Sequence, residues 1–300
     1  MRGIAADDAR RPGCSLVSGL AYTVTSSGEA AVLASGCATY TGGITLATPT
    51  EYYDGVYTHN LTGMERLDGD LELNIGNASR IDLWAQDLRW IGGELIFNSP
   101  QGENSTRLGL SNLVSVASLR SFRDPAIRFI LDSLTNLGSL WIQDYGPSII
   151  ENLEVASIGG VHIVNNSRLE DVHMMVRNIT DELIIERGGP ATIRLPELQS
   201  ARNMTIGDCS DIQLHSLEDI DGSLGLYRNS MSSFGSNATR VNGDLVLQGN
   251  WDLRNITLPD LQIVNGDFIV SGNTNLTSLG IFHRLERVVG NVEIDGPISE

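Results

Sequence analysis

The chain has 300 residues, of which 41% are hydrophobic and 19% charged, so it can bury a core as one large domain or two smaller ones. Its 37 acidic residues outnumber its 20 basic residues, all of them arginine, and the net charge is −17. This balance argues against nucleic acid and against an anionic membrane surface as partners, and no apolar run is long enough to span a bilayer.

Residues 1–13 are predicted to be an irregular tail. They contain charged residues and a proline, but no apolar stretch of the kind found in a secretory signal. Because other features described below indicate secretion, we expect that the true N-terminus, with its signal peptide, is missing from this sequence.

Residues 14–46 are expected to form an N-terminal cap. Ser26-Ser-Gly-Glu29 has the pattern of a capping box, which predicts a short helix from Glu29 to Ser35 and then a first strand from Gly43 to Leu46. The predicted apolar side of this helix consists of Ala30, Ala31, Leu33 and Ala34.

Two of the three cysteines, Cys14 and Cys37, flank the predicted helix. In a secreted chain they would form a disulfide that fastens the helix to the first strand, and otherwise they would be two reduced, buried thiols. Cys209 is left over and is expected to be a free buried thiol.

Residues 47–300 repeat a unit of about 22 residues. Each copy has a glycine followed by two apolar residues at alternate positions, as in Gly69-Asp-Leu-Glu-Leu73. The first apolar residue of each copy falls at positions 71, 95, 119, 140, 161, 183, 204, 224, 245, 268 and 292. A leucine recurs six or seven residues earlier, at Leu88, Leu113, Leu134, Leu198, Leu217, Leu261 and Leu285. The alternation predicts a short half-buried strand in each copy.

One such unit cannot bury its own apolar side, so the units must stack on one another. We therefore predict a mostly β fold, a parallel β-solenoid of leucine-rich-repeat type with about eleven units. The strands would lie about 4.8 Å apart in a long parallel sheet. No second cap is predicted before Glu300, so either further units follow in the full gene product or the gene model is truncated.

Asn-X-Ser/Thr sequences are more frequent than the roughly three expected by chance. The acceptor residues are Asn60, Asn77, Asn104, Asn165, Asn178, Asn203, Asn237, Asn255 and Asn275. Most are expected at the corners of the solenoid, where a glycan is tolerated. Alternatively, Asn, Ser and Thr are simply common at such corners. We favour N-glycosylation and secretion.

The outward-facing strand residues form the candidate binding surface. The middle outward position of each unit gives a largely apolar ribbon flanked by polar rows. Its candidate ligand-contacting residues are Ile96, Trp141, His162, Ile184, Val246 and Ile269. An extended polysaccharide or peptide would fit such a surface. Alternatively, these residues are only good strand formers, and a glycan on Asn203 would crowd the face.

The sequence contains no recognisable catalytic, metal-binding or cofactor-binding motif. The recurring acids Asp70, Asp244 and Asp267 occupy the same place in successive units, which favours a structural role in a turn. A carboxylate pair of a glycosidase is the alternative. We assign no catalytic residue and no metal ligand, and we expect no cofactor.

The cap residues and the repeat together resemble a known family. Cys14-Ser, Thr23-Val-Thr-Ser-Ser27, Glu29-Ala, Leu33, Cys37 and Gly43-Ile-Thr-Leu46, followed by Gly-Asp-Leu-x-Leu units, are similar to the fungal GPI-anchored cell-wall organisation glycoproteins. The resemblance covers residues 14–300 and implies a domain similar to the receptor L-domains. It also implies a secreted, N-glycosylated, non-enzymatic protein in the wall or on the outer face of the plasma membrane, with Cys14 and Cys37 matching the family's cap cysteines.

The sequence departs from this family because it has no signal peptide, Ser/Thr-rich stalk or hydrophobic tail, so attachment to a membrane would need a lipid anchor that is not present in this chain. We predict a protein that contributes to the organisation and integrity of the fungal cell wall, as a scaffold or by binding wall polysaccharide or wall glycoproteins. The alternatives are a receptor-like module for a protein or peptide, and a polysaccharide-active β-helix enzyme.

Overall fold

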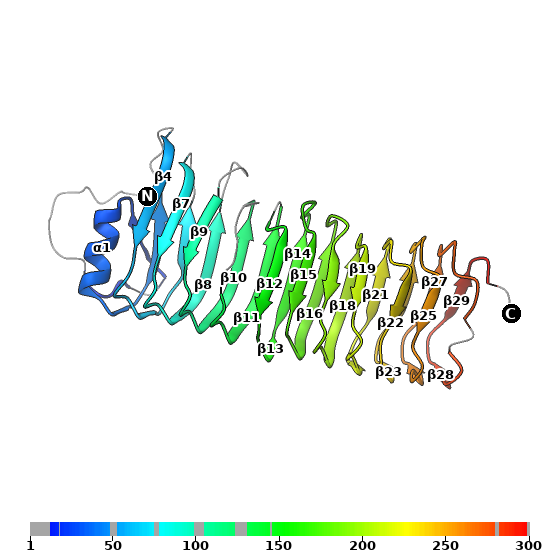
Figure 1. Ribbon diagram of the computed structural model, residues 1–300. Helices are drawn as coiled ribbons and strands as arrows, with labels where there is room; N and C mark the ends of the chain where they lie inside the picture. Colours follow the sequence, from blue (N-terminus) through cyan, green and yellow to red (C-terminus); the bar gives the residue numbers. More distant parts are fainter. Residues whose placement is uncertain are drawn as a thin grey trace.

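The computed structural model is an elongated β-solenoid whose coils are stacked in sequence order from the N-terminal to the C-terminal end (Figure 1). The structure describes residues 13–17, 19–48, 53–74, 78–98, 105–123, 131–144, 146–279 and 282–298. The predicted mostly β, parallel solenoid of about eleven units is confirmed. Except for Gly13, the predicted tail lies outside the described residues.

Helix α1 (Ser27–Gly36) covers the N-terminal end of the solenoid and begins two residues before its predicted start (Figure 1). The Ser26 Oγ accepts the Glu29 N–H at 3.2 Å, as in a capping box. The Glu29 carboxylate, however, accepts the N–H of Thr25 at 2.8 Å instead of the N–H of Ser26. The prediction for Ala31 was wrong: helical spacing buries Ala30, Leu33 and Ala34 on one side, and Ala31 faces solvent.

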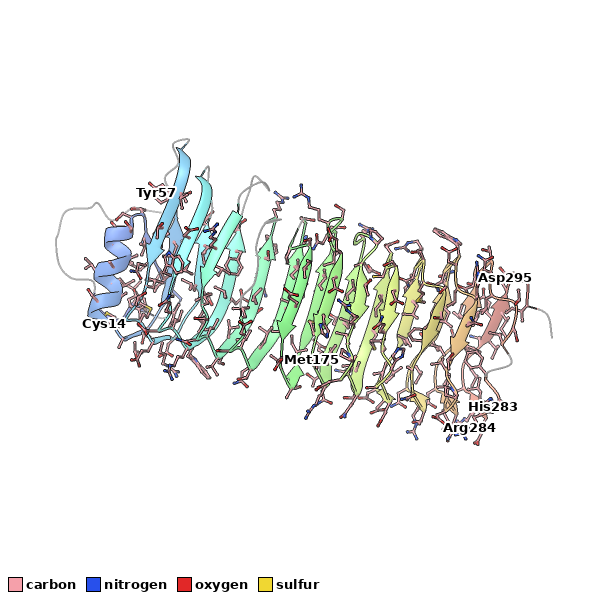
Figure 2. All side chains as sticks on the ribbon, in the orientation of Figure 1. Cys14, Tyr57, Met175, His283, Arg284 and Asp295 are labelled. Carbon is pink, nitrogen blue, oxygen red and sulfur yellow. A yellow bond between two sulfur atoms is a disulfide. The ribbon has the colours of Figure 1, made fainter. Side chains whose placement is uncertain are left out.

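Cys14 and Cys37 form a disulfide, with an S–S distance of 2.06 Å and a Cα–Cα distance of 5.4 Å. Cys37 caps the C-terminal end of α1. The bond therefore joins the end of the helix to the segment that precedes β1 (Ala21–Val24). We had expected it to fasten the helix to the strand Gly43–Leu46. Figure 2 labels Cys14 at the end of the solenoid that α1 covers. Cys209 is free and buried.

The long wall of the solenoid is a 20-stranded sheet, counted over the described residues, in which neighbouring strands run parallel. Its strands are β1 (Ala21–Val24), β2 (Thr39–Tyr40), β3 (Gly43–Ala47), β5 (Arg66–Leu67), β6 (Leu71–Asn74), β8 (Trp90–Asn98), β10 (Ser115–Phe122), β11 (Asn136–Gln143), β13 (Ser157–Ile158), β14 (Gly160–Val164), β16 (Asn178–Glu186), β18 (Ser200–Gly207), β20 (Asp219–Ile220), β21 (Leu224–Tyr227), β23 (Arg240–Val241), β24 (Leu245–Gln248), β26 (Ile263–Val264), β27 (Phe268–Ser271), β28 (Arg287–Val288) and β29 (Val292–Asp295).

Within the described ranges, the remaining strands form three smaller parallel sheets. The first contains β4 (Tyr53–Asn60), β7 (Ala78–Trp84) and β9 (Ser105–Gly109). The second contains β12 (Ile149–Leu153), β15 (Asp171–Met174), β17 (Thr192–Arg194) and β19 (Asp211–Gln213). The third contains β22 (Ser233–Gly235) and β25 (Asn255–Thr257). The repeated leucines from Leu88 to Leu261 are buried in the core, and Leu285 in the last coil is half-buried.

The spacing of the repeat in the sequence matches the register of the strands in the long sheet. Leu71 pairs with Leu95, and the same in-register pairing of first apolar residues continues coil by coil to Phe268 and Val292. Two strands that the repeat did not include, β1 and β3, extend this row toward the helix through the pairing of Ile44 with Leu71. The coils up to β27 therefore bury their apolar residues against the equivalent residues of their neighbours, whereas Val292 and Ile294 of β29 are 56% and 48% exposed.

The recurring glycine and the recurring acid are one structural device that joins successive coils. The Asp244 Oδ1 accepts the N–H of Asp267 at 2.8 Å, and the Asp267 Oδ1 in turn accepts the N–H of Asn291 at 2.7 Å. A Cβ at Gly266 would lie 2.1 Å from the Asp244 Oδ1, so only glycine leaves room for this carboxylate. These acids are therefore held by backbone N–H groups of the next coil.

A ladder of buried asparagines reinforces the C-terminal half. Asn229, Asn250 and Asn273 occupy the same place in three successive coils and are fully or almost fully buried. The Asn250 Oδ1 accepts the backbone N–H of Asn229 at 3.0 Å, and the Asn273 Oδ1 accepts that of Asn250 at 2.9 Å. The side-chain amides also donate to backbone carbonyls, Asn250 to Leu226 at 3.0 Å, so the buried polar groups of these corners are satisfied.

Candidate functional site

The six candidate ligand residues lie in one straight row across the outer face of the long sheet. In-register pairing gives the row its order, which is Ile96, Arg120, Trp141, His162, Ile184, Thr205, Gly225, Val246 and Ile269. We call this set the outward row. The four aliphatic candidates are half-buried, Trp141 is 37% exposed and His162 is only 8% exposed. The row therefore exists as the sequence predicted, but its apolar parts are interrupted at Thr205 and Gly225.

Trp141 does not offer an open ring face. The His162 imidazole stacks on one side of the indole, with ring centroids 3.7 Å apart and an interplanar angle of 6°. The Arg120 guanidinium lies 5.5 Å from the centroid of the same ring. Because neighbouring strands hold these groups on both sides, the indole exposes mainly its edge. A sugar ring therefore has no free aromatic face to stack on at this position.

Acidic side chains complete this cluster at both ends. The Arg120 guanidinium pairs with Glu94 at 2.9 Å, and the His162 Nε2 lies 3.2 Å from the Glu182 carboxylate. Burial lowers the pKa of His162 below its ordinary value of 6.5, and the nearby carboxylates of Glu182 and Asp181 oppose this effect. The centre of the outward row is thus a set of charged and aromatic groups that largely satisfy one another.

A hollow of about 200 Å³ opens on the outer face beside Gly225. Tyr227 folds back along its own strand, and its Oη lies 2.8 Å from the position that a Cβ at Gly225 would occupy. Burial, followed by the charges of Asp244 and Glu186, raises the pKa of Tyr227 above its usual value. Asn203, one of the nine glycosylation candidates, also lines this hollow.

A larger open cleft, of about 650 Å³, lies at a corner that includes β20 and β23. Its lining residues are Glu218, Asp219, Asn237, Thr239, Arg240 and Asp260. Asp260 is paired with Arg284 at 2.5 Å, which balances one of the three acids. Within the described ranges, no group of three His, Cys, Asp or Glu side chains is arranged to hold a metal ion.

The glycosylation candidates are spread over several faces. Asn77 and Asn104 lie outside the described residues. Asn60, Asn178 and Asn255 are at the ends of strands, and Asn165, Asn237 and Asn275 lie in connections between strands, as the corner prediction requires. Asn203 differs because it lies inside β18 and is exposed on the outer face of the long sheet.

The sequence reasoning missed the exposed tryptophans outside the outward row. Trp84, Trp90 and Trp251 are each at least 40% exposed. The available signal was their position in the repeat: none of the three occupies one of its two apolar strand positions. In the part of the chain that the structure describes, no helix has the length and apolar character needed to cross a bilayer.

The chain is similar over most of its length to several fungal surface proteins. It is 26% identical over 239 residues to a cell surface GPI-anchored protein of Arthroderma benhamiae, and the aligned region covers 79% of this chain and 61% of that protein. It is 27% identical over 234 residues to protein ecm33 of Aspergillus fumigatus, covering 77% of this chain and 57% of that protein. It is 26% identical over 209 residues to cell wall mannoprotein PST1 of Saccharomyces cerevisiae, covering 69% and 44% of the two chains. No family model and no solved structure matches the chain.

Proposed function

The chain is a homologue of the fungal GPI-anchored cell-surface and cell-wall proteins, and we propose that it is a non-catalytic scaffold of the cell wall that acts outside the cell. The observation that carries this proposal is the similarity to wall and surface proteins over 69–79% of the chain. The chain spans 61% and 57% of two of these relatives, so the proposal concerns the part of such a protein that this solenoid represents.

The buried asparagine ladder supports a leucine-rich-repeat or receptor L-domain type of solenoid. The segment Leu245-Val-Leu-Gln-Gly-Asn250 has the Leu-x-Leu-x-x-Asn order of leucine-rich repeats. Leu245 and Leu247 are fully buried, and the Asn250 amide donates to the carbonyl of Leu226 in the preceding coil. These are the positions that such a repeat uses to bury its core and close its corner.

We further propose that the outward row is the wall-contacting surface and that its partner is an extended polysaccharide or wall glycoprotein. Ile184 in one apolar part of this row, and Val246 and Ile269 in the other, are half-buried, so an extended partner can cover the remaining apolar area of either part. Polar neighbours such as Gln248 can supply hydrogen bonds. Contact would be made through these aliphatic side chains, because both faces of Trp141 are covered.

Binding to isolated fungal cell walls tests this surface. Val246→Glu combined with Ile269→Glu should weaken retention by at least about tenfold, because each substitution removes an apolar contact and adds a charge. Ile149→Glu is the matched control, because Ile149 is an exposed aliphatic residue in the small sheet at β12. Equal retention of both variants, with unchanged circular dichroism, would contradict the proposed surface.

The absence of catalysis is tested separately with glucan, chitin and pectin as substrates. We expect no release of reducing sugar by the purified chain. Turnover that disappears when Glu218 and Asp219 of the open cleft are replaced by Gln and Asn would overturn the scaffold proposal in favour of a polysaccharide-active enzyme.

A further inference from the structure

We propose that the N-linked glycan at Asn60 packs its first sugars against the indole of Trp84, on the outer side of the small sheet β4–β7–β9. This inference rests on the proposed function only in requiring that the chain pass through the glycosylating pathway. The site is distinct from the outward row, since it lies on a different wall of the solenoid, next to the end that α1 covers (Figure 1).

Asn60 is well placed to carry a glycan. It is the last residue of β4, its side chain is exposed, and it opens the acceptor sequence Asn60-Leu-Thr62. Its Oδ1 accepts the backbone N–H of Thr62 at 2.9 Å. This hydrogen bond engages the amide oxygen and not the nitrogen, which is the atom that carries the sugar in an N-linked glycan. In Asn275, by contrast, the Nδ2 donates to the carbonyl of Trp251 at 2.7 Å.

Trp84 is the direct neighbour of Asn60 on the adjacent strand. The two residues are paired in register between β4 and β7, so their side chains leave the same face of the sheet about 4.8 Å apart. Trp84 is 41% exposed although tryptophan is usually buried. The first or second sugar of a glycan on Asn60 is therefore within reach of this ring.

The indole of Trp84 is supported from below and is open to solvent. Its Cε3 and Cζ3 lie 2.7 and 3.3 Å from the position that a Cβ at Gly109 would occupy, on the next strand of the sheet. The glycine thus leaves a space in which the ring rests on the backbone of β9, on the side of β7 opposite to β4, and a glycan on Asn60 would reach its outer face by extending across β7. Two of the other three exposed tryptophans differ, since Trp90 lies under the Arg66 guanidinium at 5.0 Å and Trp141 is covered on both faces.

The chemistry of the two partners is complementary. The C–H groups on one face of a sugar ring carry partial positive charge, and the face of an indole carries partial negative charge. Packing the two also removes apolar area of the tryptophan from water. Since the strand register places this glycan beside Trp84, we assign the exposed ring to the protein's own glycan and not to a wall polymer.

The test is the rate at which an endoglycosidase releases each glycan from the native protein secreted by a fungal host, measured site by site by mass spectrometry. Asn255 is the reference site, because it is exposed and pairs with Ser233 and not with an aromatic residue. We expect release at Asn60 to be about threefold to tenfold slower than at Asn255, the range given by one aromatic contact. Trp84→Ala should remove this difference, and Trp84→Phe should keep part of it.

Trp90→Ala is the matched control for the loss of an exposed tryptophan and should leave both release rates unchanged. A second measurement does not depend on any Trp84 variant. Thr62→Ala, which removes the glycan at Asn60, should increase the quenching of tryptophan fluorescence by acrylamide, whereas Thr257→Ala, which removes the glycan at Asn255, should not.

The inference is overturned if Asn60 carries no glycan while other sites do, or if Trp84→Ala leaves the release rate at Asn60 unchanged. If the described acceptor sites carry no glycan at all, the proposed secretion fails as well. Faster release at Asn60 but not at Asn255 on a polymer-bound sample would assign the ring to a wall polymer instead.

Discussion

Replacing Asn250 by alanine should destabilise the solenoid far more than replacing an exposed asparagine of the same region. Asn250 is fully buried and makes four side-chain hydrogen bonds. Its Oδ1 accepts the backbone N–H and the Nδ2 of Asn229, both at 3.0 Å. Its Nδ2 donates to the Leu226 carbonyl at 3.0 Å and to the Asn273 Oδ1 at 3.2 Å.

The magnitude follows from the groups that lose their partner. In Asn250→Ala, the buried N–H of Asn229 and the carbonyl of Leu226 each lose a hydrogen bond, and water cannot reach them. An unpaired buried group costs about 1–3 kcal/mol, so we expect a loss of about 3–5 kcal/mol in the free energy of unfolding. Asn265→Ala removes one exposed hydrogen bond, from its Nδ2 to Asn242 at 3.0 Å, and should cost less than about 1 kcal/mol.

Hydrogen exchange is the suitable assay, because repeat proteins can unfold in parts and a single unfolding midpoint then loses its meaning. In Asn250→Ala, the amides of β21, β24 and β27 should lose protection, whereas those near α1 should keep it. In Asn265→Ala, protection should change little anywhere. If the two variants lost protection to the same extent, the buried ladder would not contribute to stability in the way that we argue.

Three further changes test other parts of the fold. Cys14→Ser should lower the stability of the N-terminal end by about 2–4 kcal/mol, measured by hydrogen exchange, and detection of two free thiols at Cys14 and Cys37 of the native protein would contradict the disulfide. Gly266→Ala should cost about 1–3 kcal/mol because its Cβ would lie 2.1 Å from the Asp244 carboxylate; Gly188→Ala, whose Cβ would lie 3.7 Å from its nearest neighbour, should be almost neutral in the same measurement. Burial lowers the pKa of His59, so the unfolded chain binds the proton more readily and stability should fall as the pH drops below about 6.5; thermal unfolding should show a weaker pH dependence in His59→Gln but not in the control His215→Gln, in which an exposed histidine is replaced.

The solenoid could be predicted from the sequence because the same residue pattern recurs in each of its coils. Alternating apolar residues and a preceding glycine recur every 20 to 24 residues, and this period fixes both the strands and their register. β1 escaped the prediction because its glycine, Gly19, lies three residues before Tyr22, the residue in register with Ile44, and not two as in the repeat. It joins the sheet through its pairing with Gly43–Leu46, which the periodicity alone does not reveal.

Contacts between side chains of different coils could not be predicted in this way. Arg187, Asp208 and Arg228 each adopt a positive φ at the corner where later coils have Gly249 and Gly272. The glycines give the clearest sequence signal for this conformation, Asp208 a weaker one and the two arginines none, and the non-glycine corners are held by contacts such as the 3.0 Å pair of Arg228 with Asp208. The stacking of Trp141 on His162 has the same origin: each residue was visible in the sequence, but the covering of both ring faces depends on the neighbouring coils.

The position of Asn203 limits how a wall polymer can use the outward row. Its Oδ1 accepts the N–H of Ser223 at 3.1 Å, so the side chain is held on the outer face beside the hollow at Gly225. A glycan there would stand between the apolar part that ends at Ile184 and the part that begins at Val246, and one straight polymer could not contact both. Asn203→Gln should therefore strengthen retention on isolated walls. Unchanged retention, with the glycan shown to be present in the unmodified protein, would mean that the bound polymer does not cross the middle of the row and that contact is confined to one of its two apolar parts.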